Sequence, residues 1–118
     1  MGRFSQSITI VAASGGYEET TEAIVDTGAT FTVIPAPVLE HMGVAPQRTV
    51  RMRLADGSVV ERALGTVQAR LNGTEGVIYC LFGGAEEAAV IGAHTLEGFL
   101  LAVDPVGKRL VPVEGLWL

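Results

Sequence analysis

The stretch AIVDTGATFTVIP, residues 23–35, places one acidic residue between two apolar runs that are rich in β-branched side chains. The acid is Asp26, and Thr27 and Gly28 follow it. Acidic residues are depleted in β-strands, and a carboxylate in apolar surroundings needs either polar partners or a function. A polar turn that ends an ordinary strand would use the same three residues. The apolar residues on both sides favour the functional interpretation of Asp26.

The composition indicates one ordinary domain with a full apolar core. The chain has 118 residues, of which 48% are apolar, so we expect a single domain over residues 1–118. Its one cysteine excludes an intrachain disulfide. A lone cysteine fits a reducing compartment, and we expect a cytoplasmic protein.

The charge and hydropathy patterns bear on the class of partner. The net charge is −5, and the seven arginines and one lysine are scattered along the sequence without a basic stripe. We therefore expect no nucleic-acid partner. No apolar run approaches the ~20 residues of a membrane span, so we expect no membrane partner either.

Short apolar, β-branched runs recur along the chain between turns that contain glycine or proline. Two other segments, residues 35–44 and residues 93–99, predict short helical turns. Many short strands with no long helix are typical of an all-β fold, here a closed or partly closed barrel. The strands are expected at residues 7–12, 23–25, 31–34, 49–54, 59–64, 66–71, 77–82, 89–92, 100–103 and 110–113.

Polar and glycine-containing segments predict the turns. Asp56-Gly57 predicts the tip of a long hairpin with a type I′ turn, and Asn72-Gly73 predicts the next turn. The polar stretch at residues 14–22 predicts a turn between strands, with a solvated loop face formed by Glu18, Glu19 and Glu22.

Two motifs occur in order along the chain, with a hairpin signal between them. The first is IVDTGATFTVIP at residues 24–35, and the second is AVIGAHTL at residues 89–96. The hairpin signal is LADGSVV at residues 54–60. In this order they resemble the retropepsin-like, or retroviral-type, aspartic proteases, and more narrowly their free-standing cellular and bacterial branch. The resemblance spans nearly the whole chain and implies a retropepsin-like closed acid-protease barrel with one lobe per chain.

Asp26 would need a second carboxylate to act as a catalyst, because peptide hydrolysis without a metal can use two carboxylates that hold one water. Two negative charges ~3 Å apart would repel by roughly 5 kcal/mol at an effective dielectric constant of 20, so the pair shares a proton. Asp56 and Asp104 lack the Asp-Thr-Gly setting. The resemblance therefore implies an aspartic endopeptidase that works as a homodimer, with two copies of Asp26 at a two-fold axis and no cofactor or metal.

The resemblance also assigns roles to the neighbours of Asp26. Thr27 would join the two active-site loops through its hydroxyl, and Gly28 would let the backbone approach the substrate. The substrate would be an extended peptide with apolar side chains, and the hairpin tip would close over it as a flap. The implied substrate-binding residues are Ala29, Val33, Ala55, Asp56, Gly57, Ser58 and Val90.

The chain departs from the retroviral pattern at three positions. Retroviral flap tips are richer in glycine, whereas this tip carries Asp56. Many retroviral members also pair an acid two residues after the motif glycine with an arginine directly after Ile-Gly. Here Thr30 and Ala93 occupy these positions, so both partners of that pair are absent together.

Other residues have simpler interpretations. Cys80, in the run VIYCLF, is expected to be a buried core residue and not a nucleophile. His41 and His94 lie far apart in the sequence and make a poor zinc site. The apolar chain end at Trp117 is expected to pack on its own barrel or on a partner.

Two other functions fit the same sequence. A catalytically silent, dimeric peptide-binding module would keep the fold, although a binder has no need of a like-charge pair. The other is a protease domain cut from a longer polyprotein. Against this second alternative, the start at Met1 favours a free-standing protein.

Overall fold

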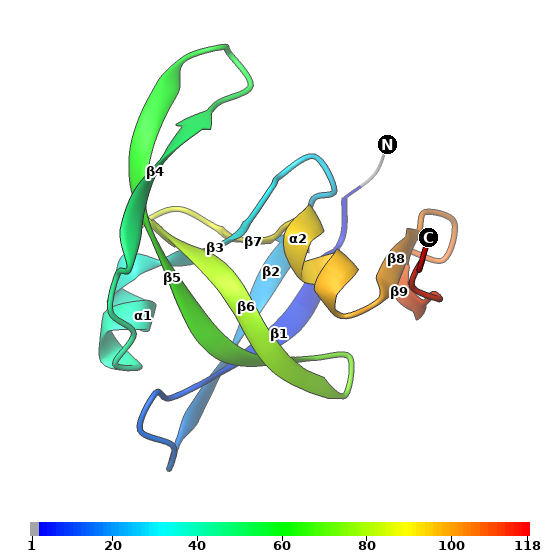
Figure 1. Cartoon of the computed structure of the whole chain (residues 1–118), viewed down its shortest axis with the longest axis horizontal. Coiled ribbons are helices and arrows are strands. Elements are labelled where there is room, and N and C mark those ends of the chain that lie inside the picture. The colour runs from blue at the N-terminus through cyan, green and yellow to red at the C-terminus, as the bar shows by residue number, and fades with distance from the viewer. Residues whose placement is uncertain (1–2) are drawn as a thin grey trace.

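The computed structural model describes residues 3–118, so the first two residues of the predicted domain lie outside the described residues. The chain is built mainly of strands with two short helices (Figure 1). The strands are β1 (Ser5–Val11), β2 (Glu18–Val25), β3 (Thr32–Pro35), β4 (Arg48–Arg53), β5 (Val59–Leu71), β6 (Thr74–Gly83), β7 (Ala89–Ile91), β8 (Leu101–Asp104) and β9 (Arg109–Pro112). The helices are α1 (Ala36–His41) and α2 (Ala93–Gly98).

Six strands close into a barrel. Their order is β1-β2-β7-β3-β6-β5, and β1 returns to pair with β5. Strand β4 pairs only with β5, so the β4–β5 hairpin, residues 48–64, projects from the barrel (Figure 1). Strands β8 and β9 form a separate two-stranded sheet on the opposite side. This architecture confirms the predicted all-β, retropepsin-like closed barrel with two short helices.

The barrel interior is filled by alternate residues of each strand. In β1, for example, Ile8 and Ile10 are fully buried while the residues between them face outward. Alternation of this kind is what strand geometry requires of a sheet that is packed on one face. The largest fully buried side chains are Ile8, Ile10, Ile34, Leu39, Met42, Leu64, Leu71, Ile91, Thr32 and Cys80.

The polar stretch before Ala23 is not the loop that the sequence predicts. Residues 18–22 belong to β2 and pair with β1 in antiparallel register. The side chains of Glu18, Thr20 and Glu22 lie on the outer face, where Thr9 and Thr20 hydrogen-bond at 2.8 Å and Glu18 forms a two-pronged pair with Arg70 at 2.8 and 3.1 Å. That arginine lowers the pKa of Glu18 through its hydrogen bonds. Glu19 and Thr21 alternate to the other face and are half-buried. Polar residues can form a strand here because one face of a barrel is solvated.

Strand β5 is continuous where the sequence predicts two strands with a break near Gly65. Gly65 is buried, and a side chain there would bring its Cβ within 2.9 Å of the Ala45 carbonyl oxygen. The glycine therefore serves a close approach between β5 and the segment before β4, and does not end the strand.

The hairpin tip has a different turn from the predicted type I′. The loop has three residues, 55–57, closed by hydrogen bonds from Gly57 N to Leu54 O and from Leu54 N to Ser58 O, at 2.9 and 2.8 Å. Only Gly57 has a positive φ, of 89°. This arrangement is typical of a type I turn followed by one left-handed glycine. At the β5–β6 turn, in contrast, Asn72 and Gly73 both have positive φ, as a type I′ turn requires.

The apolar chain end does not pack on its own barrel. Trp117 is 99% exposed, and Leu116 and Leu118 are equally open. One of the two predicted placements for this segment is therefore wrong, and packing on a partner stays a prediction.

Candidate active site

Asp26 lies in a tight loop between β2 and β3, directly after the end of β2 in the barrel wall (Figure 1). Its Oδ1 accepts a hydrogen bond from Gly28 N at 2.9 Å, and Ala29 N donates to its carbonyl oxygen at 3.1 Å. The side chain is 31% exposed. One carboxylate oxygen is thus held by the loop, while the carboxylate as a whole remains accessible.

The segment after β7 holds this loop in shape. Asp26 N donates to Ile91 O at 3.0 Å, and Ala93 N donates to Ala29 O at 2.7 Å. A Cβ on Gly92 would lie 2.4 Å from Phe31 O, so only glycine fits where the two segments cross. The two motifs that the sequence places far apart therefore meet as one unit.

A buried pair of hydroxyls also joins the two motifs, and the sequence interpretation missed it. Thr32 Oγ1 and Thr95 Oγ1 are 2.6 Å apart, and Gly92 N donates to Thr32 Oγ1 at 3.2 Å. Both threonines are essentially inaccessible to solvent. The one sequence feature that relates them is that each threonine follows a Gly-Ala pair, Gly28-Ala29 or Gly92-Ala93, by a few residues.

Thr27 and Gly28 lie on the exposed side of the loop. Within residues 3–118, the Thr27 hydroxyl makes no hydrogen bond with another side chain or with the backbone. Its predicted partner is the second copy of the same loop, so its role as a link between loops stays a prediction.

Arg3 lies against the open side of the carboxylate. Its Nη2 is 3.6 Å from Asp26 Oδ2, and the arginine side chain is 67% exposed. The contact is an exposed ion pair, which contributes little to stability.

The side chains of the other two aspartates accept hydrogen bonds within turns of the chain. Asp56 Oδ1 accepts from Ser58 N at 2.9 Å and from Ser58 Oγ at 2.6 Å, and these bonds lower its pKa. Asp104 accepts from the backbone N–H of Gly107 and pairs with Arg109, and both contacts lower its pKa. Asp56 and Asp104 therefore stabilise turns, and Asp26 is the aspartate whose loop is bonded to the Ile-Gly motif.

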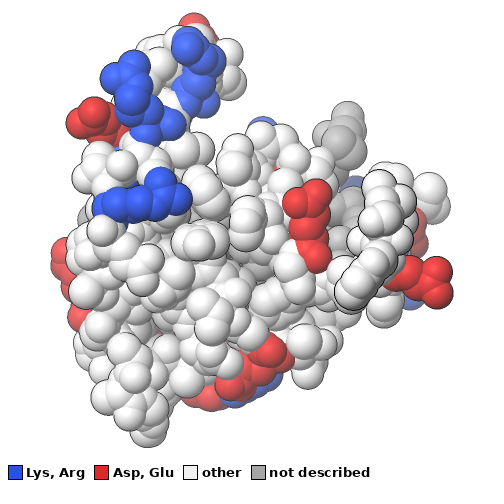
Figure 2. Space-filling model, in the orientation of Figure 1, with Lys and Arg blue, Asp and Glu red and all other residues white. Residues whose placement is uncertain are grey.

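A cavity of about 220 Å³ lies between the Asp26 loop and the β4–β5 hairpin. The space-filling view shows the hollow beside the hairpin (Figure 2). Most lining side chains are apolar, and three of them are charged. The lining residues are Gly28, Ala29, Thr30, Phe31, Val33, Met52, Arg53, Leu54, Val60, Arg62, Leu81, Phe82, Gly83 and Glu87.

The cavity contains some of the predicted substrate-binding residues and not others. Ala29 and Val33 line it. Val90 pairs with Val33 across β7 and β3 but does not line the cavity. The tip residues 55–58 are exposed beyond it, and the lining on the hairpin comes from neighbours of the tip, including Leu54. The roles of all these residues in binding stay predictions.

The alternative chemistries find little support in the geometry. Cys80 is fully buried, and burial raises the pKa of its thiol to about 12. His94 packs against Phe31 and Tyr79, and His41 packs against Tyr17. Across residues 3–118, no three His, Cys, Asp or Glu side chains are grouped closely enough to hold a metal ion. In the same part of the chain, no helix has the length and apolar character to cross a membrane.

Two solved structures share this fold. The retroviral protease-like domain of Ddi1 from Leishmania major superposes with a TM-score of 0.60 at 19% identity, covering 95% of this chain and 89% of that one. The Simian Foamy Virus (mac) protease superposes with a TM-score of 0.56 at 16% identity, covering 79% of this chain and 91% of that one. At these identities the likeness concerns the fold alone.

The sequence comparison reaches further than the fold. No curated protein sequence matches this one. A family described as aspartyl protease matches residues 10–95, which include the Asp26 loop, the β4–β5 hairpin and the Ile-Gly motif. Because this match covers well over half of the chain and contains both motifs that form the site, the chain belongs to the aspartyl protease family.

Proposed function

We propose that this protein is an aspartic endopeptidase that works as a homodimer, with one Asp26 from each copy. The observation that carries the proposal is the state of the Asp26 carboxylate. One of its oxygens is held by the loop, the side chain is partly exposed, and a largely apolar cavity begins at Gly28, two residues farther along the same loop. The family match supports the chemistry, because aspartyl proteases need such a carboxylate.

The reaction would use both carboxylates in different protonation states. One Asp26 carboxylate takes a proton from the shared water as the water oxygen bonds to the scissile carbonyl carbon. The protonated Asp26 of the other copy donates its proton to the carbonyl oxygen. The tetrahedral gem-diol then collapses: the C–N bond breaks, the dyad donates a proton to the amine nitrogen and takes one from a hydroxyl of the gem-diol, and its shared proton is restored. Two charges so close would repel, which keeps one carboxylate protonated.

An extended peptide with apolar side chains is the proposed substrate. Val33, Leu81 and Phe82 on the barrel face Leu54 and Val60 on the hairpin across the cavity. Its volume is below the ~300–1,000 Å³ of a site for a drug-sized molecule, so one copy would bind only part of a substrate. The hairpin would act as the flap that excludes water from the reacting bond.

Each chain supplies one Asp-Thr-Gly carboxylate, so the proposed mechanism requires a second copy. The exposed chain end offers an apolar surface through which two copies would pair. Leu116, Trp117 and Leu118 form an apolar cluster that no part of residues 3–118 covers. Burying it at about 25 cal/mol per Å² would contribute several kcal/mol per copy before ordering costs are subtracted.

A cleavage assay tests the proposal. The protein is incubated with a diverse peptide library at pH 4 to 7, with and without EDTA, beside Asp26→Asn. Asparagine keeps an oxygen that can accept from Gly28 N, so the variant should fold normally and lose about 10²–10⁴-fold in turnover. Cleavage that persists in Asp26→Asn, or that EDTA abolishes, would contradict the proposal.

The second candidate is a silent peptide-binding module, and the contact between Arg3 and Asp26 favours it. If Arg3 kept its place in the dimer, it would compete with the catalytic water for Oδ2. The same library distinguishes the two, because a silent module would bind peptides without cleaving them at any pH in this range.

A further inference from the structure

The β4–β5 hairpin carries a charge opposite to that of the chain as a whole. Four of the eight basic residues lie on it, against two acids, so its net charge is +2 on a chain of net −5. Arginine side chains gather on this projection, where Figure 2 shows them in blue. Half of the basic residues of the chain are therefore concentrated on one projection. The basic residues of the hairpin are Arg48, Arg51, Arg53 and Arg62, and the acids are Asp56 and Glu61.

The register of the hairpin separates these arginines by face. Arg62 pairs with Val50, and Val60 pairs with Met52, so these four side chains share the inner face. All four are half-buried. Arg51 pairs with Glu61 on the outer face, and both are exposed. Arg62 is the arginine that the strand alternation directs toward the barrel.

Arg62 reaches the cavity without a carboxylate partner. It lines the cavity together with Met52 and Val60, and its Nη1 donates to the Glu61 carbonyl oxygen at 3.0 Å. No ion pair involves it among residues 3–118. A half-buried guanidinium retains several donors in a planar fork that suits a carboxylate.

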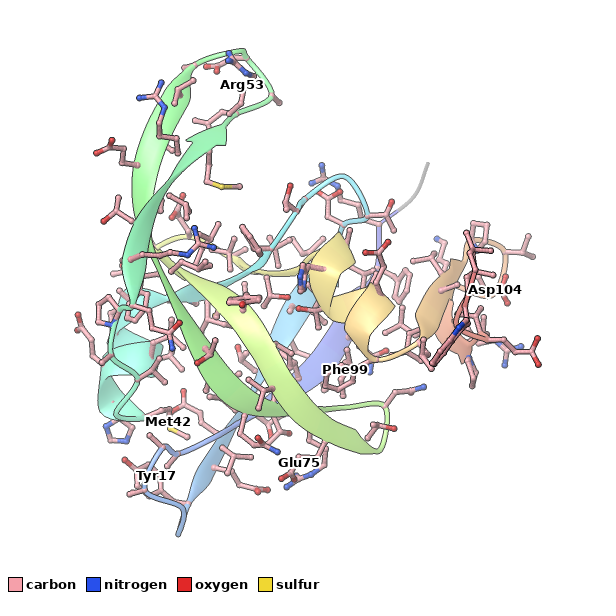
Figure 3. All side chains as sticks on the ribbon, in the orientation of Figure 1. Tyr17, Met42, Arg53, Glu75, Phe99 and Asp104 are labelled. Atoms are coloured by element: carbon pink, nitrogen blue, oxygen red, sulfur yellow. The ribbon has the colours of Figure 1, made fainter. Side chains whose placement is uncertain are left out.

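The other two charged groups at the cavity are already engaged. Arg53 extends at the hairpin tip, and its Nη1 donates to Gly57 O at 2.8 Å (Figure 3). Glu87, on the barrel side, accepts a hydrogen bond from Gly84 N. Counting these three groups, the cavity presents two positive charges and one negative charge to its contents.

We infer that the substrate carries an acidic side chain beside its apolar ones, and that Arg62 binds this carboxylate. The inference rests on the proposed protease function, since it concerns the same cavity. A charge-assisted, two-pronged contact is stronger than a neutral hydrogen bond and would select glutamate or aspartate at one substrate position. It would also weaken as salt is added, since the site is open to solvent.

A matched peptide library tests the inference. The peptides contain two adjacent apolar residues, and glutamate, glutamine or lysine is scanned through the flanking positions. Cleavage by the wild-type protein is followed by mass spectrometry, and kcat/KM is compared within each Glu/Gln pair. At one position we expect a preference for glutamate of about ten-fold or more, as for a hydrogen bond to a charged group.

Three variants assign that preference to a residue. In Arg62→Gln the Glu/Gln ratio should fall to near one, and in Arg62→Glu the lysine peptide should become the better substrate. Arg51→Gln removes an equal charge from the outer face of the same strand pair and should leave the ratio unchanged. A ratio that survives in Arg62→Gln, or that falls equally in Arg51→Gln, would overturn the assignment.

A binding measurement separates this inference from the proposed function. The same peptides, labelled with a fluorophore, are titrated into Asp26→Asn and into the double variant Asp26→Asn, Arg62→Gln. Preferential binding of glutamate peptides that Arg62→Gln abolishes would support the inference even if the wild-type protein cleaved nothing. Equal binding of glutamate and glutamine peptides at every position would overturn it, whatever the cleavage assay shows.

Discussion

Arg3 Nη2 lies 3.6 Å from Asp26 Oδ2, so a basic side chain from the N-terminal segment contacts the proposed catalytic carboxylate. The other oxygen, Oδ1, is already bound by Gly28 N. Exposed ion pairs of this kind contribute about 0–1 kcal/mol, and a second copy of the loop could displace Arg3 at little cost.

Arg3→Ala should therefore raise kcat/KM at low salt, because it frees the oxygen that the proposal assigns to water. The gain should shrink as salt increases, since screening weakens the same contact in the wild-type protein. Peptide cleavage over a salt series measures this, and Arg109→Ala, which removes an exposed pair with Asp104, is the control. A fall in activity in Arg3→Ala would mean that Arg3 supports the site.

Gly92→Ala should destabilise the fold strongly. The added Cβ would meet backbone atoms of Phe31 at 2.4 and 2.5 Å, and backbone cannot move aside as a flexible side chain can. We expect a loss of about 1–3 kcal/mol or more. Gly98→Ala, at the end of α2, is the matched control, because its Cβ would meet nothing within 4 Å. Denaturant unfolding measures both, and equal stabilities would refute the close-approach argument.

Gly57→Val should damage activity more than stability. Gly57 has φ of 89° and open space around it, so valine would cost only the backbone strain of about 1–2 kcal/mol. Gly73→Val imposes the same strain at the β5–β6 turn, where φ is 83° and the cavity is not touched. The two variants should melt alike, and only Gly57→Val should lose cleavage. Equal losses of cleavage would show that the hairpin has a purely structural role.

The turn at the hairpin tip should keep its Asp56–Ser58 hydrogen bonds over the acidic pH range in which an aspartate dyad would work. Ser58 holds the pKa of Asp56 below its ordinary value of 3.8, first through its hydroxyl and then through its N–H. A lowered pKa means that the stabilisation is present above pH 3.8 and is lost as pH falls through the lower, folded value. The Ser58 amide shift in an NMR titration should therefore stay constant from pH 7 to pH 4. A transition above pH 4 would contradict this.

Deleting residues 115–118 should weaken the dimer and lower activity together. The three apolar side chains of this segment are exposed, so their removal should change the folding stability of a single chain little. Activity should recover at high protein concentration, which sedimentation and cleavage over one concentration series would show. Val106→Ser is the control, since Val106 is an equally exposed apolar residue at the β8–β9 turn. Cleavage by a protein that remains monomeric would refute the shared dyad.

The sequence predicted the elements whose signals are local. The two motifs located β3, α1, β7 and α2 correctly, because each depends on apolar runs next to proline or glycine. The start of β2 was missed, because residues 18–22 are polar on both faces of the strand and lack the alternation of apolar and polar residues that marks a half-buried strand. Gly65 was interpreted as a break, because the contact with Ala45 that explains it is distant in sequence.

The candidate site also contains residues with a local sequence signal and residues whose role depends on distant contacts. Asp26 was evident from its apolar neighbours, whereas Arg62 became visible only through the register of the hairpin. A shift of β5 by one residue in that register would have placed Arg62 on the outer face, which Arg51 already occupies. The Thr32–Thr95 contact was hidden for a similar reason, since neither threonine has a local signal of burial.

The bonds between the Asp26 loop and residues 91–95 also fix when, during synthesis, the site can exist. The ribosome adds about 5–20 residues per second, so Asp26 emerges several seconds before Ile91, Gly92 and Thr95 do. Until then its loop lacks the carbonyl of Ile91 and the hydroxyl of Thr95. The parallel pairing of β2 with β7 closes a long loop, which makes it a late step of folding. A nascent chain thus carries Asp26 without the contacts that hold its loop until the barrel closes.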